Sequence, residues 1–380
     1  MPSKTCRKLK NSKPPNPETV KSVRRNLLRW FHANARDLPW RRADDPYAVW
    51  VSEIMLQQTQ VATVIDYYNR FMKRFPTVEK LSRAKQDTVL KMWEGLGYYS
   101  RGRNLHKAAK LIVSDYRGQL PNTVDRLQKI PGIGRYTAGA IASIAFNRPA
   151  PILDGNVIRV LCRLFCIDTN PKDTATKNHL WELAETLVHT KHPGDFNEAL
   201  MELGAMVCTP QNPMCPTCPL RNQCRAKKHN RQHELPIKHK QAPLPHYTIV
   251  VGIVHKGSQV LIDKRKQNAL LGGLWEFPGG KKKKSESFKT AVAREVKEET
   301  GIEIEVGKRL CIIKHTYSHF KITLHAYRCE YTSGVIKPVG CDAVKWVAPK
   351  DLTQYAFPAA NVKIIKVLNT PQQTRGDRSL

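Results

Sequence analysis

The chain has 380 residues, of which 41% are hydrophobic, so it can form more than one hydrophobic core. The chain has 63 Lys and Arg against 32 Asp and Glu, which gives a net charge of +31. This charge argues against a protein that binds only neutral metabolites. It favours a polyanionic partner, with nucleic acid preferred over an anionic membrane. No apolar run approaches the roughly 20 residues of a membrane span, and the basic N-terminus lacks the apolar core of a secretory signal. Ten cysteines without such a signal predict a reducing compartment, where clustered cysteines bind metal.

Four regions follow one another along the chain. Residues 1–16 are polar and basic, which predicts a disordered tail. Residues 17–225 carry apolar residues at helical spacing, which predicts an all-α domain, and the cationic, proline-containing residues 226–245 are interpreted as a linker. Residues 246–380 are predicted to form a smaller α/β domain. Its expected strands are 247–254, 260–262, 321–327 and 344–347, and its expected helix is 288–299.

Glu53 is the first candidate catalytic residue. It lies on a helical pattern among apolar neighbours, including Trp50, Ile54 and Leu56, which leave it few exposed directions. Burial there should raise its pKa toward neutrality, because a low dielectric disfavours the charged carboxylate. The ordinary alternative is a solvated Glu on an amphipathic helix.

A tight turn within residues 127–138 joins two helical patterns. Gly132 and Gly134 permit positive φ angles and a close backbone approach, and the following helix presents free N–H groups at its start. This geometry predicts a contact to DNA phosphate that has no base preference. A turn that simply joins two helices is the alternative.

Asp154 stands immediately before a helical run that begins near Val157. The helix N-terminus should keep its carboxylate ionised, although an ordinary N-cap is the favoured interpretation from sequence alone. A protonated Glu53 beside an ionised Asp154 would pair an acid and an anion for one reaction.

Four cysteines lie close together in the spacing C-x6-C-x2-C-x5-C, at Cys208, Cys215, Cys218 and Cys224. Their thiolates suit a tetrahedral metal ion or a cubane cluster, and the spacing leaves both zinc and iron–sulfur open.

A group of acidic residues marks the C-terminal domain. Glu295, Glu298 and Glu299 are spaced so that they share one face of a helix, where they repel one another unless a cation such as Mg²⁺ lies between them. A solvated acidic face is the alternative. The run Gly280-x5-Glu286-x7-Arg294-Glu295 that leads into these acids resembles a complete Nudix box.

Taken together, these residues resemble the MutY-type adenine DNA glycosylases of the helix-hairpin-helix superfamily over about residues 20–368. The motifs that carry the resemblance are residues 38–41, 52–60, 95–99, 127–138 and 153–156 with the four cysteines. The resemblance implies a monofunctional base excision repair enzyme that hydrolyses the N-glycosidic bond of adenine mispaired with 8-oxoguanine or guanine in double-stranded DNA. It also implies one 4Fe-4S cluster on the four cysteines. We expect a monomer in a bacterial cytoplasm.

The resemblance also assigns roles to single residues. Glu53 protonates adenine N7 and Asp154 stabilises the oxocarbenium-like sugar. The matching substrate-binding positions are Trp40, Arg41 and Glu198 in the adenine pocket, Tyr136 and Asn156 near the sugar and water, and Gln58 and Tyr98 as wedges in the duplex. Core packing is the alternative for Trp40 and Tyr98. The related endonuclease III branch has a Schiff-base Lys where this chain has Tyr136, which favours a monofunctional enzyme.

The C-terminal domain resembles the MutT-like domain with which such glycosylases sense 8-oxoguanine. Ser318 and His319 resemble the lesion-sensing loop, and the four lysines of residues 281–284 suit a DNA backbone. Because the Nudix box is intact, a second hypothesis is a bifunctional protein that also hydrolyses oxidised nucleoside triphosphates with Mg²⁺. A third hypothesis is a damage-binding protein without catalysis, which rests on the basic surface alone.

Overall fold

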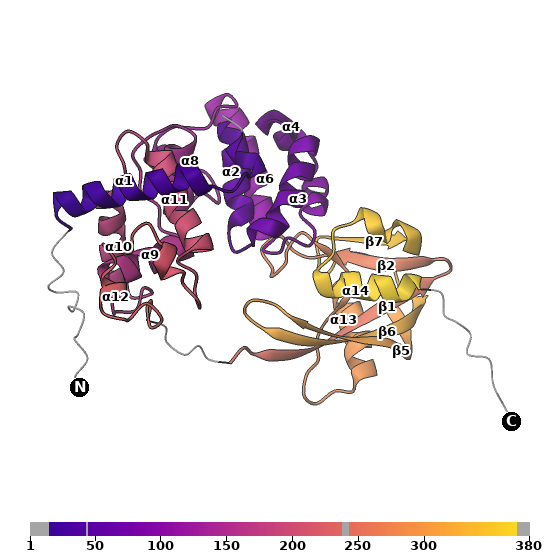
Figure 1. Cartoon of the computed structure of the whole chain (residues 1–380). Coiled ribbons are helices and arrows are strands. Elements are labelled where there is room, and N and C mark those ends of the chain that lie inside the picture. The colour runs from indigo at the N-terminus through magenta and orange to yellow at the C-terminus, as the bar shows by residue number, and fades with distance from the viewer. Residues whose placement is uncertain (1–14, 43–44, 238–242, 371–380) are drawn as a thin grey trace, which may run out of the picture. The chain divides into compact units, whose positions relative to one another are not determined.

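The computed structural model describes residues 15–42, 45–237 and 243–370 (Figure 1). Most of the predicted N-terminal tail therefore lies outside the described residues. Two compact units are present, one formed by Met1–Arg83 with Asn104–Gln241 and the other by Ala84–Arg103 with Ala242–Leu380. No helix in the described part of the chain is long and apolar enough to cross a membrane.

The described residues of the first unit are helical, which confirms the predicted all-α region. Its α-helices are α1 Pro17–Asn34, α2 Pro46–Leu56, α3 Val61–Arg74, α4 Val78–Arg83, α7 Val124–Leu127, α8 Arg135–Ile144, α9 Gly155–Phe165, α10 Thr174–Leu187, α11 Pro193–Met206 and α12 Arg225–Lys228. Short 3₁₀ turns are η2 Pro39–Arg41 and η3 Cys215–Thr217. Helix α6 Ser100–Tyr116 begins in the segment assigned to the second unit and continues in the first.

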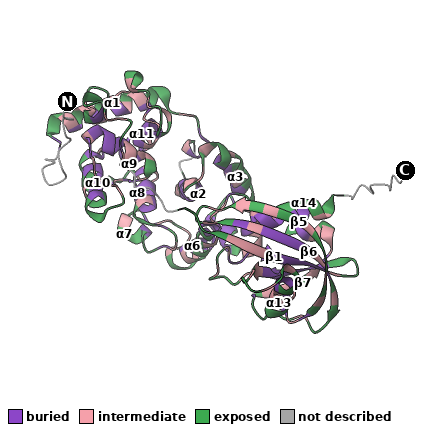
Figure 2. Cartoon of the chain, turned by 90° about the horizontal axis from the view of Figure 1, so that it is seen from below, coloured by how far each residue is buried: buried purple, intermediate pink, exposed green. Residues whose placement is uncertain are grey.

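Helix α1 shows how local sequence forms these helices. The Asn16 side chain accepts a hydrogen bond from the Thr19 backbone N–H at 2.8 Å and so caps the first turn. Val20, Val23 and Leu27 then recur at three- and four-residue intervals and are buried, so that one stripe of the helix faces the core. The same stripe of buried residues runs along α9, α10 and α11, as the purple inner faces in Figure 2 show.

The turn between α7 and α8 differs in one respect from the expectation. Gly132 has a φ of 84°, and an added Cβ would lie 2.8 Å from the Asn104 Cβ, so this position requires glycine. Gly134 is the N-cap of α8 and has a φ of −86°, so it does not use the positive φ that glycine permits. A Cβ at Gly134 would meet open space, which leaves the start of α8 accessible.

The second unit is a mixed sheet with helices, which confirms the predicted α/β class. Its strands are β1 His246–Lys256, β2 Gln259–Lys264, β3 Trp275–Glu276, β4 Gly279–Lys281, β5 Glu303–Thr316, β6 Lys321–Ser333 and β7 Ala343–Val347. The main path is β3-β2-β1-β6-β5, with β4 paired to β1 and β7 paired to β2, and β1 runs parallel to β6. Its helices are α5 Gln86–Met92, α13 Phe288–Thr300, α14 Ala359–Asn369 and the 3₁₀ helix η4 Pro349–Gln354.

Alternation along β1 places the sheet between two helices. Val251 and Ile253 share a core with Ile364 of α14, whereas Val250 and Val254 share a core with Val292 and the rest of the buried face of α13. Successive residues of a strand point to opposite faces, so the β-branched run in β1 supplies both cores.

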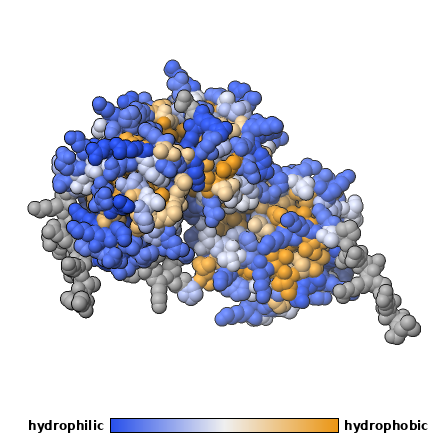
Figure 3. Space-filling model, in the orientation of Figure 1, coloured by the Kyte–Doolittle hydropathy of each residue, from blue (hydrophilic) through white to orange (hydrophobic). Residues whose placement is uncertain are grey.

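The predicted linker is structured in part. Ala226 and Leu235 are buried against Cys166 in the first unit, and only residues 238–242 of the expected linker lie outside the described residues. On the face of the helical unit shown in Figure 3, hydrophilic residues predominate, in keeping with the high content of Lys and Arg.

Candidate active site and cysteine centre

Glu53 lies near the end of α2, where nine consecutive residues of the helix are buried. Only 4% of Glu53 is exposed, and its Oε2 accepts a hydrogen bond from the Tyr136 hydroxyl of α8 at 2.8 Å. Burial is the main cause that raises the pKa of Glu53 to about 7, and the negative charges of Glu198 and Asp154 raise it further. The hydrogen bond from Tyr136 opposes this rise. The burial and the pKa direction agree with the expectation from sequence.

Asp154 is the N-cap of α9. Its Oδ1 accepts from the Val157 backbone N–H at 2.7 Å, and its Oδ2 accepts from the Asn156 side-chain amide at 3.0 Å. Burial nevertheless raises the pKa of Asp154, and the hydrogen bonds and the Arg159 charge oppose this rise. The hydrogen bonds at the helix terminus act in the direction expected from the sequence, because they favour the ionised carboxylate, but desolvation is the largest influence on the pKa. The N-cap alternative is realised, and the charge of Asp154 also acts on the pKa of Glu53.

Tyr136 interacts electrostatically with both the candidate acid and the candidate anion. Burial, together with the charges of Glu53 and Asp154, raises the pKa of Tyr136 well above its ordinary value, so the hydroxyl keeps its proton and remains a donor. The Tyr136 hydroxyl also lies 3.2 Å from the Met201 Sδ of α11. Glu53 of α2, Tyr136 of α8 and Asp154 at the N-cap of α9 thus influence one another electrostatically and form one coupled group.

Arg41 connects this group to a set of acids on α11. Its Nε donates to Glu198 Oε1 at 2.7 Å and its Nη2 donates to Glu202 Oε2 at 3.2 Å. Arg36 also donates to both oxygens of Glu202 at 2.8 Å, and the two arginines overcome burial to lower the pKa of Glu202 to about 2. The sequence reasoning missed Arg36 and Glu202. The spacing of Glu198 and Glu202 by four residues on one helix face was the available signal.

Trp40 is packed in the core, which is the alternative interpretation that the sequence left open. It is 7% exposed, and its ring packs edge-on against Tyr68 with centroids 5.4 Å apart. It therefore helps to hold η2, and with it Arg41, against α3.

The two expected wedge residues have an unusual backbone conformation. Gln58 and Tyr98 have φ angles of 56° and 45°, in the left-handed region that non-glycine residues rarely adopt. Such conformations are often found at functional sites. Gln58 is exposed, and Tyr98 is half-buried within the second unit.

Ser318 and His319 are exposed in the connection between β5 and β6. The Tyr98 hydroxyl donates to the Ser318 Oγ at 2.6 Å, and both residues belong to the second unit. A predicted wedge and a predicted lesion-sensing residue are therefore neighbours.

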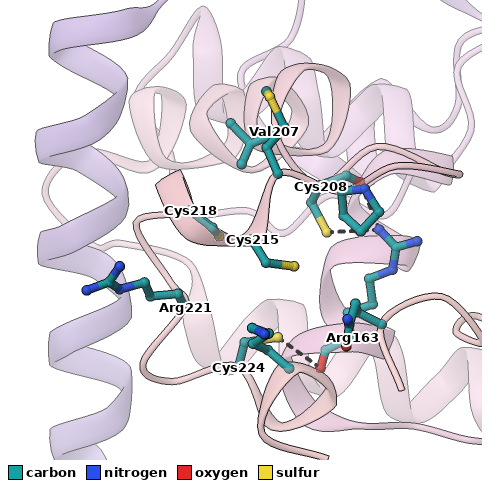
Figure 4. A pocket seen from close by; sticks show the side chains of 11 residues that line it. Arg163, Val207, Cys208, Cys215, Cys218, Arg221 and Cys224 are labelled. Atoms are coloured by element: carbon teal, nitrogen blue, oxygen red, sulfur yellow. Dashed lines mark hydrogen bonds between the residues drawn. The ribbon is translucent and has the colours of Figure 1, made fainter. Parts of the chain in front are cut away.

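The four cysteines surround one small cavity beside α9 (Figure 4). Arg163 of α9 is 2% exposed, and its Nη1 donates to the Cys208 Sγ at 3.3 Å. The same guanidinium donates to the carbonyls of Thr209 and Pro210 at 2.7 and 3.0 Å and so fixes the loop. Four sulfur donors around one space beside a buried cation fit a metal or cluster held by thiolates.

The acids of the Nudix-like segment are divided between partners. Arg294 donates to Glu286 at 2.7 and 2.9 Å, to Glu295 at 2.8 Å and to Glu298 at 3.0 Å. Glu299 instead accepts from the Gly279 backbone N–H at 2.8 Å. A cavity of about 570 Å³ is lined by Glu295 and Glu299 but not by Glu298. In the lysine loop 281–284, the Lys281 Nζ lies 3.9 Å from the Tyr247 ring centroid.

Comparison with known proteins places both units in recognised families. Residues 51–186 match the family described as "HhH-GPD superfamily base excision DNA repair protein", and residues 249–367 match the NUDIX domain. The chain is 38% identical to the adenine DNA glycosylase of Homo sapiens, over 93% of this chain and 75% of that protein. It is 31% identical to the adenine DNA glycosylase of Schizosaccharomyces pombe, over 88% of this chain and 86% of that protein.

A solved structure is similar to the helical part. A thermostable thymine-DNA glycosylase matches with a TM-score of 0.50 and 28% identity, over 56% of this chain and 97% of that chain. The helical fold, the two domain matches and the extent of the similarity to curated relatives agree with the resemblance found in the sequence. The chain belongs to the adenine DNA glycosylase family.

Proposed function

We propose that the protein excises adenine from double-stranded DNA in base excision repair and leaves an abasic site. The observation that carries this proposal is the coupled pair of carboxyl groups, in which the pKa of Glu53 is about 7 and Asp154 accepts two hydrogen bonds at a helix start. A purine anion is a poor leaving group and the sugar cation formed by its departure needs a nearby anion. The pair supplies a proton donor for the first need and a negative charge for the second.

The proposed reaction begins when adenine leaves the base stack and enters the site. Glu53 transfers its proton to N7, the bond between C1′ and N9 breaks, and its electron pair stays with the base, which leaves as neutral adenine. Asp154 stabilises the positive charge that develops on the sugar. A water molecule then adds its oxygen to C1′ and loses a proton to the Glu53 carboxylate, which restores the acid. Asn156 holds the Asp154 carboxylate through the 3.0 Å hydrogen bond.

Tyr136 supports a monofunctional reaction. Its hydroxyl donates to Glu53 and, once Glu53 has lost its proton, the same donor stabilises the new carboxylate. A tyrosine at this position supplies no amine for a Schiff base with the sugar, so strand cleavage through such an intermediate is not expected.

A single-turnover assay on a duplex with adenine opposite 8-oxoguanine tests this proposal. We expect free adenine to be released and the strand to break only after alkali treatment, because the enzyme itself produces an abasic site. A control duplex with thymine in place of adenine should remain intact. A covalent enzyme–DNA adduct trapped by borohydride would contradict the monofunctional reaction, and the absence of adenine release would contradict the proposal as a whole.

We also propose that the β5–β6 connection reads the base opposite the adenine. The exposed Ser318 hydroxyl and His319 ring offer donors and acceptors to the edge of 8-oxoguanine. In the first unit, the accessible start of α8 after Gly134 offers free N–H groups to a DNA phosphate.

Replacing Ser318 and His319 together by Ala should erode the preference for 8-oxoguanine over guanine. Each lost hydrogen bond to the lesion corresponds to about 0.5–1.5 kcal/mol, so the preference should fall roughly tenfold or more. The measurement is the ratio of excision rates on the two duplexes. Thr353→Ala, in η4 of the same unit, is the control and should leave the ratio unchanged. An unaltered ratio in the double variant would place lesion recognition elsewhere.

The cysteine centre is proposed to hold a 4Fe-4S cluster. The four thiols converge on one space, and Arg163 adds a positive charge that suits the net negative charge of a thiolate-bound cluster. When bound, the cluster would fix the loop that carries Arg221 and Arg225 and present these cations to a DNA backbone.

A further inference from the structure

Three carboxyl groups, two of them buried and one half-buried, meet inside the second unit, apart from the candidate active site. They belong to Asp263 of β2, Glu276 of β3 and Glu299 of α13, and one oxygen of each lies within 4.8 Å of the others. Asp263 of β2 and Glu276 of β3 are directly opposite one another in the antiparallel pair, so the strand pairing itself brings their side chains together.

Asp263 is the unexplained member of this group. It is 1% exposed, and neither of its carboxyl oxygens has a hydrogen-bond partner among the described residues. The nearby cation, Arg265, is instead directed to Glu276, with its Nη1 2.5 Å from Glu276 Oε1. A buried carboxyl group that has lost its hydration without gaining a partner destabilises the folded state, so a favourable partner is expected.

The other two acids leave room for such a partner. Glu299 uses Oε2 to accept from the Gly279 N–H, and Glu276 uses Oε1 to accept from Arg265. Protonation alone does not satisfy Asp263, because a neutral carboxyl still has a hydroxyl that must donate. A cation bound by one oxygen from each side chain satisfies all three groups at once, and carboxylate oxygens are the preferred ligands of hard divalent cations.

We propose that Asp263, Glu276 and Glu299 form a binding site for a divalent cation of the Mg²⁺ and Mn²⁺ class. The ligand set differs from the three acids expected from the sequence, Glu295, Glu298 and Glu299, and shares only the last of them. Arg294 already neutralises Glu295 and Glu298, which explains why the site lies on the strand side of Glu299. The 570 Å³ cavity, which Glu276 and Glu299 line, gives the ion a route from solvent. The proposal does not depend on adenine excision.

The test measures Mn²⁺ binding to the full chain. Binding is detected as the loss of the free-ion signal in electron paramagnetic resonance. Asp263→Asn keeps the size of the side chain but removes its charge, and we expect it to weaken Mn²⁺ binding at least tenfold. Glu276→Gln should weaken Mn²⁺ binding to the same extent. This second variant shows whether the loss comes from the missing ligand rather than from a local folding defect in Asp263→Asn. Glu298→Gln and Glu305→Gln are the controls: the first removes an acid of the sequence-predicted set, and the second removes an exposed acid of β5.

Thermal unfolding supplies a second readout that needs no activity. In the wild-type protein, Mn²⁺ should raise the Tm at which the second unit unfolds, because only the folded site binds the ion. In Asp263→Asn, Mn²⁺ should not raise this Tm. Loss of binding in Glu298→Gln with retention in Asp263→Asn would overturn the proposal in favour of the sequence-predicted set. Failure of the wild-type protein to bind Mn²⁺ would also overturn it.

Discussion

Glu53→Gln should lower the single-turnover rate of adenine excision by about 10²–10⁴-fold, the usual contribution of a positioned general acid. Glutamine has nearly the same size as glutamate and can accept the Tyr136 hydrogen bond, but it has no proton to give to adenine N7. The rate is measured with enzyme in excess over a duplex that contains adenine opposite 8-oxoguanine, and duplex affinity is measured separately. We expect the affinity to change little, since Glu53 is only 4% exposed.

Stability separates lost chemistry from lost folding in this variant. Burial raises the pKa of Glu53 from 4.5 to about 7, so this group favours the folded state fully below pH 4.5 and progressively less up to about pH 7. At pH 8 its removal should therefore stabilise the fold, by at most about 3 kcal/mol. Glu182→Gln on α10 is the matched control, because its carboxyl group is 74% exposed, and it should alter neither rate nor stability. Substantial excision by Glu53→Gln would remove Glu53 from its proposed role.

Asp154→Asn should lower the excision rate by about 10²–10³-fold while leaving the fold nearly intact. Asparagine caps a helix as well as aspartate does, so the hydrogen bond to the Val157 N–H can be kept. Only the negative charge beside the sugar is lost. The free energy of unfolding should not fall, because the cap is kept and the group removed has a raised pKa, whereas Asp154→Ala should lose roughly 1 kcal/mol with the cap.

A second aspartate provides a close control for this experiment. Asp45 is the N-cap of α2 and accepts from the Tyr47 N–H at 2.9 Å, the same local role that Asp154 has in α9. Asp45→Asn should keep full activity. If Asp154→Asn retained the wild-type rate, Asp154 would be a helix cap and nothing more, and the charge that stabilises the sugar would have to come from another residue.

The sequence predicted the helices and the main strands because their buried residues repeat at the period of each element. The apolar run of β1 and the stripe along α1 are examples of this. It also predicted the burial of Glu53, since the neighbours Trp50, Ile54 and Leu56 on α2 left few exposed directions. Strand β5 was not predicted, because exposed and half-buried residues alternate along it without a strong apolar face.

Contacts between distant segments could not be predicted in the same way. Arg36 reaches Glu202 across 166 residues, and Arg163 reaches the carbonyls after Cys208, so neither pairing follows from local spacing. The raised pKa of Asp154 was missed because the helix terminus is visible in the sequence but the surrounding burial is not. Asp263 was missed because its partners on β3 and α13 come together only when the sheet forms.

The pH dependence of single-turnover excision tests the assignment of Glu53 as the proton donor most directly. Glu53 must carry its proton to react, so the rate should be high below pH 7 and fall about tenfold per pH unit well above the Glu53 pKa of about 7. The residual rate of Glu53→Gln should lose this dependence. A wild-type rate that stays constant or rises between pH 7 and 9 would contradict the assignment of Glu53 as the proton donor.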